Sequence, residues 1–341
     1  MPPFPKPKDI DFEWKNATEL KAIIDMQDNG DYKLPKPKGN QLLCATWNIA
    51  NFDSQKRDAK AYELIAEILR PFDLVAVQEV NSDLSGIYEV MEFLPDHDLL
   101  FTDIAGNKER LCYVYNYKKL GLTPHVGELD IPPSDRRFYK MTFHDENCDP
   151  CIHRFSGFDR NPYVASWVFK DFVFSTYNCH IYFGDEKEDD ILKFRRRIVE
   201  IYSLVKWVTS KTNHKNGYVF SPNVLILGDM NVPSMKKDDE VFKQIKNKTF
   251  SPVDYTDYLT PYSNIKNDMT FDQLVIAKPF AEEMSLEGYG IFSWDNAVFK
   301  KLWKDLEEED KKNAAKRFQA YAKWAISDHR PLWCLFEFQD D

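Results

Sequence analysis

The sequence has no excess of positive charge and no apolar run long enough to cross a membrane. Its 341 residues carry 45 Lys and Arg against 55 Asp and Glu, a formal net charge of −10. This balance argues against broad, non-specific affinity for nucleic acid or acidic lipid. It does not exclude a nucleic-acid enzyme, because a metal site supplies positive charge locally. No uninterrupted apolar run approaches the roughly 20 residues of a transmembrane helix, so we expect no transmembrane segment.

Signals for secretion are also scarce. The first residues, M-P-P-F-P-K-P-K-D-I-D, lack the apolar segment of a signal peptide. Of the six cysteines, four lie in apolar, strand-like runs and are predicted to be buried thiols: Cys44, Cys112, Cys179 and Cys334. Because this cysteine usage suits a reducing compartment, the sequence favours a cytoplasmic protein over a secreted one.

The apolar residues are abundant and arranged in short runs. The hydrophobic fraction of 43% allows a substantial core. Strands are predicted at 42–48, 73–78, 111–117, 163–170, 172–179, 223–228, 271–277 and 331–338, and helices at 12–26, 58–70, 187–209, 237–247 and 296–326. Because the helices fall between the strands, the pattern predicts an α/β (α+β) protein with two packed β-sheets flanked by helices. No repeat or mid-chain linker is evident, so we expect an N-terminal extension with a short helix at 1–40 and a single domain at 41–341.

Polar residues follow or precede six of these predicted strands. They are Asn48, Glu79, His180, Asp229, Asn231, Asp272, Asp328 and His329. Any one of them is an ordinary turn residue at a strand end. Six strands that each deliver an oxygen ligand or an imidazole favour a shared site for Mg²⁺ or Mn²⁺ and an activated water. Zinc is disfavoured because no H-E-x-x-H or paired-thiolate motif accompanies them.

Six motifs in this order resemble one known family. W-N-I-A-N-F, V-A-V-Q-E-V, Y-N-C-H, L-I-L-G-D-M-N, F-D-Q-L-V-I and I-S-D-H-R-P-L-W are similar to those of the endonuclease/exonuclease/phosphatase superfamily, closest to deoxyribonuclease I-like proteins. The resemblance runs from about residue 42 to residue 338. It implies a four-layered sandwich of two packed mixed β-sheets flanked by helices, and hydrolysis of phosphodiesters with the help of a metal.

The resemblance also implies the roles of individual residues. The metal is expected on Glu79, Asn48, Asp328 and Asp229. The catalytic set comprises His329 oriented by Asp272, His180 oriented by Glu109, and Asp229 with Asn231 positioning the water or the phosphoryl oxygens. The substrate phosphate is expected to contact Arg160 and Asn48, since a planar guanidinium suits a phosphate oxygen.

The expected activity is that of a Mg²⁺- or Mn²⁺-dependent nuclease, with DNA favoured over RNA as the substrate. Three residues depart from those with which deoxyribonuclease I grips duplex DNA: Ala50, Asn81 and Asn107. The chemistry is therefore predicted more specifically than the polymer. The alternative is a phosphatase or phospholipase C-type hydrolase of the same superfamily, sphingomyelinase-like or acting on inositol phosphates. That alternative predicts an exposed apolar hairpin or a Lys/Arg cluster near His180, whereas the sequence after His180, I-Y-F-G-D-E-K-E-D-D, is acidic.

Two segments leave alternatives open. Residues 134–160 mix Arg, Lys and aromatics, which suits either single-stranded nucleic acid binding or a loop that covers a sheet edge. Within it, His144, Cys148, Cys151 and His153 form either a small zinc site or, as the spacing favours, a free-thiol or disulfide loop. The acidic stretch 303–317 is interpreted as a solvated helical insertion, with a lid or partner-binding helix as the alternative.

Overall fold

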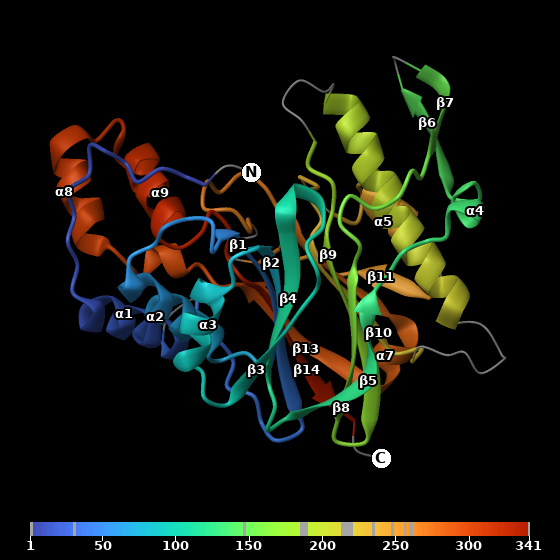
Figure 1. Cartoon of the computed structure of the whole chain (residues 1–341), viewed down its shortest axis with the longest axis horizontal. Coiled ribbons are helices and arrows are strands. Elements are labelled where there is room, and N and C mark those ends of the chain that lie inside the picture. Colours follow the sequence, from blue (N-terminus) through green and yellow to red (C-terminus); the bar gives the residue numbers. More distant parts are fainter. Residues whose placement is uncertain are drawn as a thin grey trace.

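Two six-stranded β-sheets pack face to face at the centre of the protein, as the computed structural model shows (Figure 1). It describes residues 3–29, 32–145, 148–184, 190–212, 221–233, 236–246, 249–255, 257–258 and 262–339. The first sheet has the order β13 (Met284–Ile291), β14 (Leu332–Phe338), β1 (Gln41–Phe52), β2 (Leu74–Asn81), β4 (Glu109–Asn116), β3 (His97–Phe101). The second has the order β11 (Phe250–Pro252), β12 (Asp272–Ala277), β10 (Val224–Asp229), β9 (Phe172–His180), β8 (Tyr163–Phe169), β5 (Leu120–Glu128).

Helices cover the outer face of each sheet. On the first sheet lie α1 (Asn16–Asp28), α2 (Ala59–Leu69), α3 (Ser85–Glu92), α8 (Lys300–Asp310) and α9 (Ala314–Ala325); beside the second lie α5 (Asp190–Thr212), α6 (Glu240–Ile245) and α7 (Lys278–Glu283) (Figure 1). A short helix, α4 (Pro133–Arg136), leads into a separate hairpin, β6 (Lys140–Asp145) with β7 (Cys148–Arg154). The predicted four-layered sandwich is confirmed.

Each sheet is mixed and contains one parallel pair. Strands β1 and β2 run parallel in the first sheet, and β9 and β10 run parallel in the second, while the other pairings are antiparallel. Strands β1, β2, β9 and β10 all run towards the same edge of the sandwich. Polar residues at the carboxyl-terminal parts of these strands are therefore brought together. This edge carries the candidate site.

The strands that the sequence predicts are those inside the two sheets. The predicted strands correspond to β1, β2, β4, β8, β9, β10, β12 and β14, whereas the strands at the sheet edges, β3, β5, β11 and β13, were not predicted. Interior strands are covered on both faces and read as continuous apolar runs. Strand β1 is buried along its whole length, whereas β5 is largely exposed and carries a mixed sequence, L-G-L-T-P-H-V-G-E.

The predicted helix 296–326 is wrong as a single helix. It forms two helices, α8 and α9, which pack on each other as a hairpin. At the turn between them the Asn313 side chain donates to Asp310 Oδ2 at 2.7 Å, a local bond that competes with continuation of the helix. The prediction 187–209 begins at residues 187–189, which lie outside the described residues.

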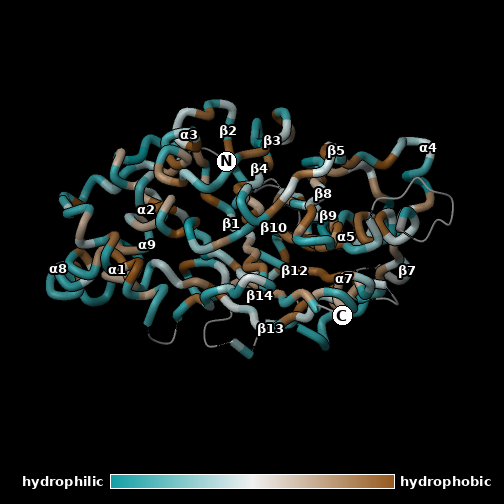
Figure 2. The backbone as a smooth tube through the Cα atoms, turned by 90° about the horizontal axis from the view of Figure 1, so that it is seen from below, coloured by the Kyte–Doolittle hydropathy of each residue, from teal (hydrophilic) through white to brown (hydrophobic). Residues whose placement is uncertain are grey.

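The apolar alternation of β1 divides the core into two parts. Leu42 and Cys44 face the second sheet, whereas Leu43 and Trp47 face the helices of the first sheet. Figure 2 shows hydrophobic stretches running through the central strands, with hydrophilic chain on the outer loops. Ile10 from the N-terminal extension also enters the helix-side core. No helix among the described residues is long and apolar enough to span a membrane.

The cysteines follow the prediction. Cys44, Cys112, Cys179 and Cys334 are free and buried. Cys151 is disulfide-bonded, which excludes it as a zinc ligand. The disulfide interpretation of this loop is therefore the correct one for Cys151.

Candidate active site

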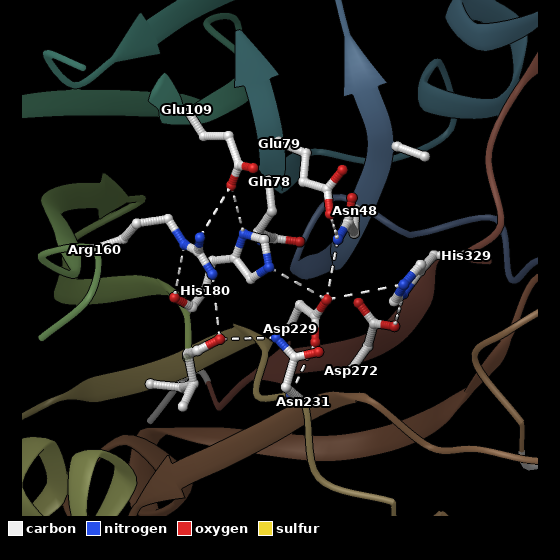
Figure 3. A network of polar contacts seen from close by, with 12 residues as sticks. Asn48, Gln78, Glu79, Glu109, Arg160, His180, Asp229, Asn231, Asp272 and His329 are labelled. Atoms are coloured by element: carbon white, nitrogen blue, oxygen red, sulfur yellow. Dashed lines mark hydrogen bonds and ion pairs between the residues drawn. The ribbon is translucent and has the colours of Figure 1, made fainter. Parts of the chain in front are cut away.

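A cavity of about 200 Å³ lies at the edge where the parallel strands end. Its walls contain Glu79, His180, Asp229, Asn231, Asp328 and His329, together with Phe183, Asn264, Lys266, Phe271 and Lys323. Six of the sequence-predicted site residues thus line one cavity. Asn48, Glu109, Arg160 and Asp272 lie behind them and contact them directly (Figure 3).

Asp229 lies between the two histidines. Its Oδ2 atom is 3.7 Å from His180 Nε2 and 3.8 Å from His329 Nε2 (Figure 3). It also accepts a hydrogen bond from Asn48 Nδ2 at 3.0 Å, while Oδ1 accepts from the backbone N–H of Asn231 at 2.9 Å. Burial alone would raise the pKa of Asp229, but the two imidazoles and these hydrogen bonds lower it. Asp229 is therefore a buried carboxylate held in its charged form.

His329 is oriented by a buried carboxylate. Its Nδ1 atom lies 2.8 Å from Asp272 Oδ2, and both side chains are almost wholly buried. Burial alone would lower the pKa of His329, but nearby carboxylates, first that of Asp272 and then that of Asp229, raise it to about 10. The backbone carbonyl of His329 accepts hydrogen bonds from the indoles of Trp47 and Trp294 at 2.9 and 3.0 Å. These bonds fix the backbone that carries the imidazole.

His180 is backed by a carboxylate that it shares with an arginine. Glu109 Oε2 lies 3.4 Å from His180 Nδ1 and 3.2 Å from an Arg160 guanidinium nitrogen. Burial alone would raise the pKa of Glu109, but His180 and the charge of Arg160 lower it to about 2.

Arg160 is an internal residue of the site. Its side chain is only 2% exposed, and it donates to the carbonyl oxygens of His180 at 3.1 Å and Ile181 at 3.3 Å. The structure therefore shows Arg160 bracing the end of β9 and neutralising Glu109. The predicted contact of Arg160 with a substrate phosphate remains a prediction.

Glu79 and Asn48 provide oxygen donors beside Asp229. Glu79 Oε1 accepts from Asn48 Nδ2 at 3.0 Å, and Oε2 accepts from the backbone N–H of Asn51 at 2.8 Å. Glu79 has φ 62°, a left-handed conformation that is costly for a residue with a Cβ and is concentrated at functional sites.

These donors fit a hard divalent cation. The Asn48 Oδ1 atom is buried without a hydrogen-bond partner, while Nδ2 of the same amide donates to the Glu79 and Asp229 carboxylates. Within the described part of the chain, no three His, Cys, Asp or Glu side chains converge as a preformed metal cluster. That finding is compatible with Mg²⁺, which is typically held by one or two carboxylates and several waters.

Two predicted residues make contacts that the sequence did not indicate. Asp328 Oδ2 is paired with Lys323 Nζ at 2.7 Å, and about a quarter of each side chain is exposed. The Asn231 side chain donates to the Ile181 carbonyl at 2.7 Å, so its amide positions the loop after His180.

Gly228, in the motif L-I-L-G-D, has φ 149°, and a Cβ there would lie 1.9 Å from the Cys179 carbonyl oxygen. Only glycine lets β10 pass this close to β9.

Sequence reasoning missed a polar bridge between the two sheets. Gln78 Nε2 donates to Asn178 Oδ1 at 2.7 Å across the sandwich, and Asn178 Nδ2 donates to the Val77 and Cys112 carbonyls at 3.1 and 2.9 Å. The side chains of Gln78 and Asn178 are wholly buried, so this network fixes the position of one sheet relative to the other directly below the site. Gln78 directly precedes Glu79, and Asn178 lies two residues before His180. This proximity to predicted site residues was the feature of the sequence that could have indicated the network.

An arginine pair on α5 was also missed. Arg197 donates to the Tyr182 carbonyl at 3.0 Å and the Asn231 carbonyl at 3.0 Å, and Arg196 stacks on the Tyr182 ring. Both arginines therefore pack against the loop after His180. From the sequence alone, the charge around His180 was judged only from the run of acidic residues that follows it in the chain. Of that run, residues 185–189 lie outside the described residues.

The comparisons with known proteins agree on the fold. No family model matches the chain, and no curated protein matches it. Among solved structures, it is similar to D. rerio TDP2 complexed with single-strand DNA product, at TM-score 0.55 and 11% identity over 87% of this chain and 99% of that one. It is also similar to the human Nocturnin catalytic domain with bound sulfate (TM-score 0.51, 12% identity, 88% and 95% coverage) and to an endonuclease/exonuclease/phosphatase family protein from Bacteroides thetaiotaomicron (0.51, 14%, 88% and 98%).

The chain therefore has the fold of the endonuclease/exonuclease/phosphatase family. The predicted resemblance to this superfamily is confirmed at the level of architecture. Identities of 11–14% carry no substrate from these proteins to this chain. Its activity has to be argued from its own site.

Proposed function

We propose that the protein is a metal-dependent phosphodiesterase that hydrolyses nucleic acid, with DNA favoured over RNA. The observation that supports it most is the position of Asp229 Oδ2, within 4 Å of the Nε2 atoms of both His180 and His329. Two imidazoles facing one buried carboxylate are suited to moving a proton at a phosphoryl group held between them. The exposed ring of Phe183 at the cavity suits stacking of a nucleobase.

Glu79 and Asn48 Oδ1 would hold Mg²⁺ or Mn²⁺, with Asp328 and Asp229 beside them. When bound, such a cation neutralises phosphoryl charge and lowers the pKa of a coordinated water. Asp229 would orient the attacking water and accept hydrogen bonds from it. His329, held protonated by Asp272, would donate to a phosphoryl or leaving-group oxygen, and His180 would face the same group from the opposite side.

A second candidate is a phospholipase C-type or phosphatase activity, of the sphingomyelinase-like kind. It is favoured by apolar side chains around the β6–β7 hairpin, where Ile152 is 53% exposed and nearby Phe138 is 58% exposed. An exposed apolar hairpin was one of the two features that this alternative predicted, the other being a Lys/Arg cluster near His180. Against it, Phe143 and Met141 of the same hairpin pack against the core, so only part of the hairpin is available to a membrane.

One panel separates the two candidates. Supercoiled plasmid, single-stranded DNA, RNA, sphingomyelin vesicles and inositol phosphates would each be incubated with wild type and His329→Ala in Mg²⁺, Mn²⁺ or EDTA. The proposal predicts metal-dependent cleavage of a nucleic acid, with DNA cut faster than RNA, that is lost in the variant. Metal-dependent release of phosphocholine or phosphate, with the nucleic acids intact, would establish the second candidate. Failure on every substrate would contradict both.

A further inference from the structure

A lysine from the α8–α9 hairpin reaches the same cavity as the catalytic candidates. Lys323 lies in the last turn of α9, and its Nζ is 2.7 Å from Asp328 Oδ2. Its side chain is 27% exposed, so the ammonium group borders both the protein and the cavity. The hairpin therefore contributes directly to the site in addition to packing on the first sheet.

The N-terminal extension holds this lysine in place. The Phe4 ring centroid is 3.5 Å from Lys323 Nζ, which is cation–π distance. The backbone N–H of Phe4 donates to Gln55 Oε1 at 3.0 Å, and Gln55 Nε2 donates to the Lys323 carbonyl at 3.3 Å. Gln55 is 1% exposed. A buried glutamine thus ties the extension to the end of α9, and the described part of the extension starts near the upper ends of the central strands and runs across α9 (Figure 1).

Two arginines near the cavity, Arg160 and Arg57, are buried and do not line it. Arg160 contacts Glu109 and two backbone carbonyls and is 2% exposed. Arg57 is 9% exposed, does not line the cavity, and donates from one nitrogen to the Ile326 and Ala50 carbonyls, while its Nε and Nη1 have no hydrogen-bond partner. Lys323, in contrast, has three N–H donors on its ammonium group, of which Asp328 accepts one, and like Lys266 it lines the cavity.

We propose that Lys323 is a substrate-phosphate-binding residue of this site, an inference that rests on the proposed phosphodiesterase function. Glu79, Asp229 and Asp328 make the cavity wall acidic, so an anionic phosphodiester needs fixed positive charge near it as well as a metal. When a phosphate enters, the Lys323 ammonium turns from Asp328 towards a non-bridging oxygen, while Phe4 and Gln55 keep the lysine at the cavity. The ligand class is a phosphodiester of a nucleic-acid strand.

The test uses the full chain and a matched control. Lys323→Ala removes the ammonium, Lys323→Arg retains its charge, and Lys301→Ala removes an exposed lysine of α8 that pairs with Asp305. Steady-state cleavage of single-stranded DNA should show KM raised about 10- to 100-fold by Lys323→Ala, with a smaller change in kcat. Lys323→Arg should recover most of the loss, and Lys301→Ala should match wild type. Anisotropy of a fluorescent (dT)10 strand in Ca²⁺ should show the same order of affinities.

The outcomes distinguish this inference from the proposed function. Wild-type cleavage with unchanged KM and (dT)10 affinity in Lys323→Ala would overturn the role of Lys323 and leave the phosphodiesterase standing. The same would follow if Lys323→Ala only tightened Mn²⁺ binding, since the lysine would then be a counter-ion of Asp328. A wild-type protein that neither cleaves nor binds these substrates would overturn the proposed function, and the inference with it.

Discussion

The two histidine arms of the site share one geometry but differ in the groups that lie behind each imidazole. Each imidazole turns Nε2 towards Asp229 and Nδ1 towards a buried carboxylate. Behind His180, the carboxylate of Glu109 is also neutralised by Arg160. Behind His329, the Asp272 carboxylate faces the histidine at 2.8 Å, and its Oδ1 is buried without a hydrogen-bond partner. Because its carboxylate neighbours raise the pKa of His329 to about 10, His329 is the arm that we expect to hold a proton.

The largest expected effect comes from removing the imidazoles. His329→Ala should lower kcat by about 10²–10⁴-fold, because a charged hydrogen-bond donor is lost. His180→Ala should cost less within the same range. Single-turnover cleavage of single-stranded DNA would measure both. Equal losses of kcat in the two variants would contradict the proposed difference between His329 and His180. Near wild-type rates in both would show that neither histidine is catalytic.

The second prediction concerns Arg160, which only one arm possesses. Arg160→Met should destabilise the fold by about 3–5 kcal/mol, because Glu109 is left as a buried charge without its partner. Urea unfolding followed by circular dichroism would measure it. The double variant Arg160→Met/Glu109→Gln should regain much of the loss, since the stranded charge is removed. A single variant as stable as wild type would show that Arg160 is not needed to neutralise Glu109.

A smaller effect is expected from the carboxylate behind His329. Asp272→Asn removes the largest charge that raises the pKa of His329, so that pKa should fall. If protonated His329 is the active form, activity is present below this pKa and is lost as pH rises through it. The alkaline limb of the kcat profile should then move to lower pH by about three to four units, towards the ordinary histidine pKa, with a roughly 10- to 100-fold loss at pH 8. Glu109→Gln is the matched control and should leave that limb in place; an unmoved limb in Asp272→Asn would contradict the assignment.

The smallest expected effect is stabilisation by the metal. Mg²⁺ at about ten times its Kd should add roughly 1.4 kcal/mol to the free energy of unfolding of wild type. Glu79→Gln should abolish this increment without changing the metal-free stability greatly. Thermal unfolding with and without Mg²⁺ would check it, with Ca²⁺ as a second cation. An equal increment in the variant would place the metal elsewhere.

The sequence predicted the site better than it predicted the outer parts of the fold. Asn48, Glu79, His180 and Asp229 could be found because each follows an apolar run of an interior strand, and parallel neighbours run towards the same edge. His180 and Asp229 are the last residues of β9 and β10, whereas β1 and β2 continue past Asn48 and Glu79 to Phe52 and Asn81. Edge strands such as β13 escaped because one of their sides pairs with no strand, so their sequences are mixed in polarity.

The residues that were missed have no local signature. Lys323 looks like any lysine of an amphipathic helix, and only the packing of α9 brings it to Asp328. Phe4 lies in the N-terminal extension, outside any predicted helix or strand, yet it contacts the same lysine. Long-range packing decides such contacts, and neither periodicity nor spacing encodes it.

The most direct test of the account is the metal dependence of phosphodiester hydrolysis by a variant that keeps its fold. Wild type and Glu79→Gln would be compared on bis-p-nitrophenyl phosphate and on single-stranded DNA across a Mg²⁺ titration, with circular dichroism to establish folding. The account predicts saturable, Mg²⁺-dependent cleavage by wild type and none by folded Glu79→Gln. Undiminished turnover by the variant, or turnover by wild type that is indifferent to EDTA, would contradict it.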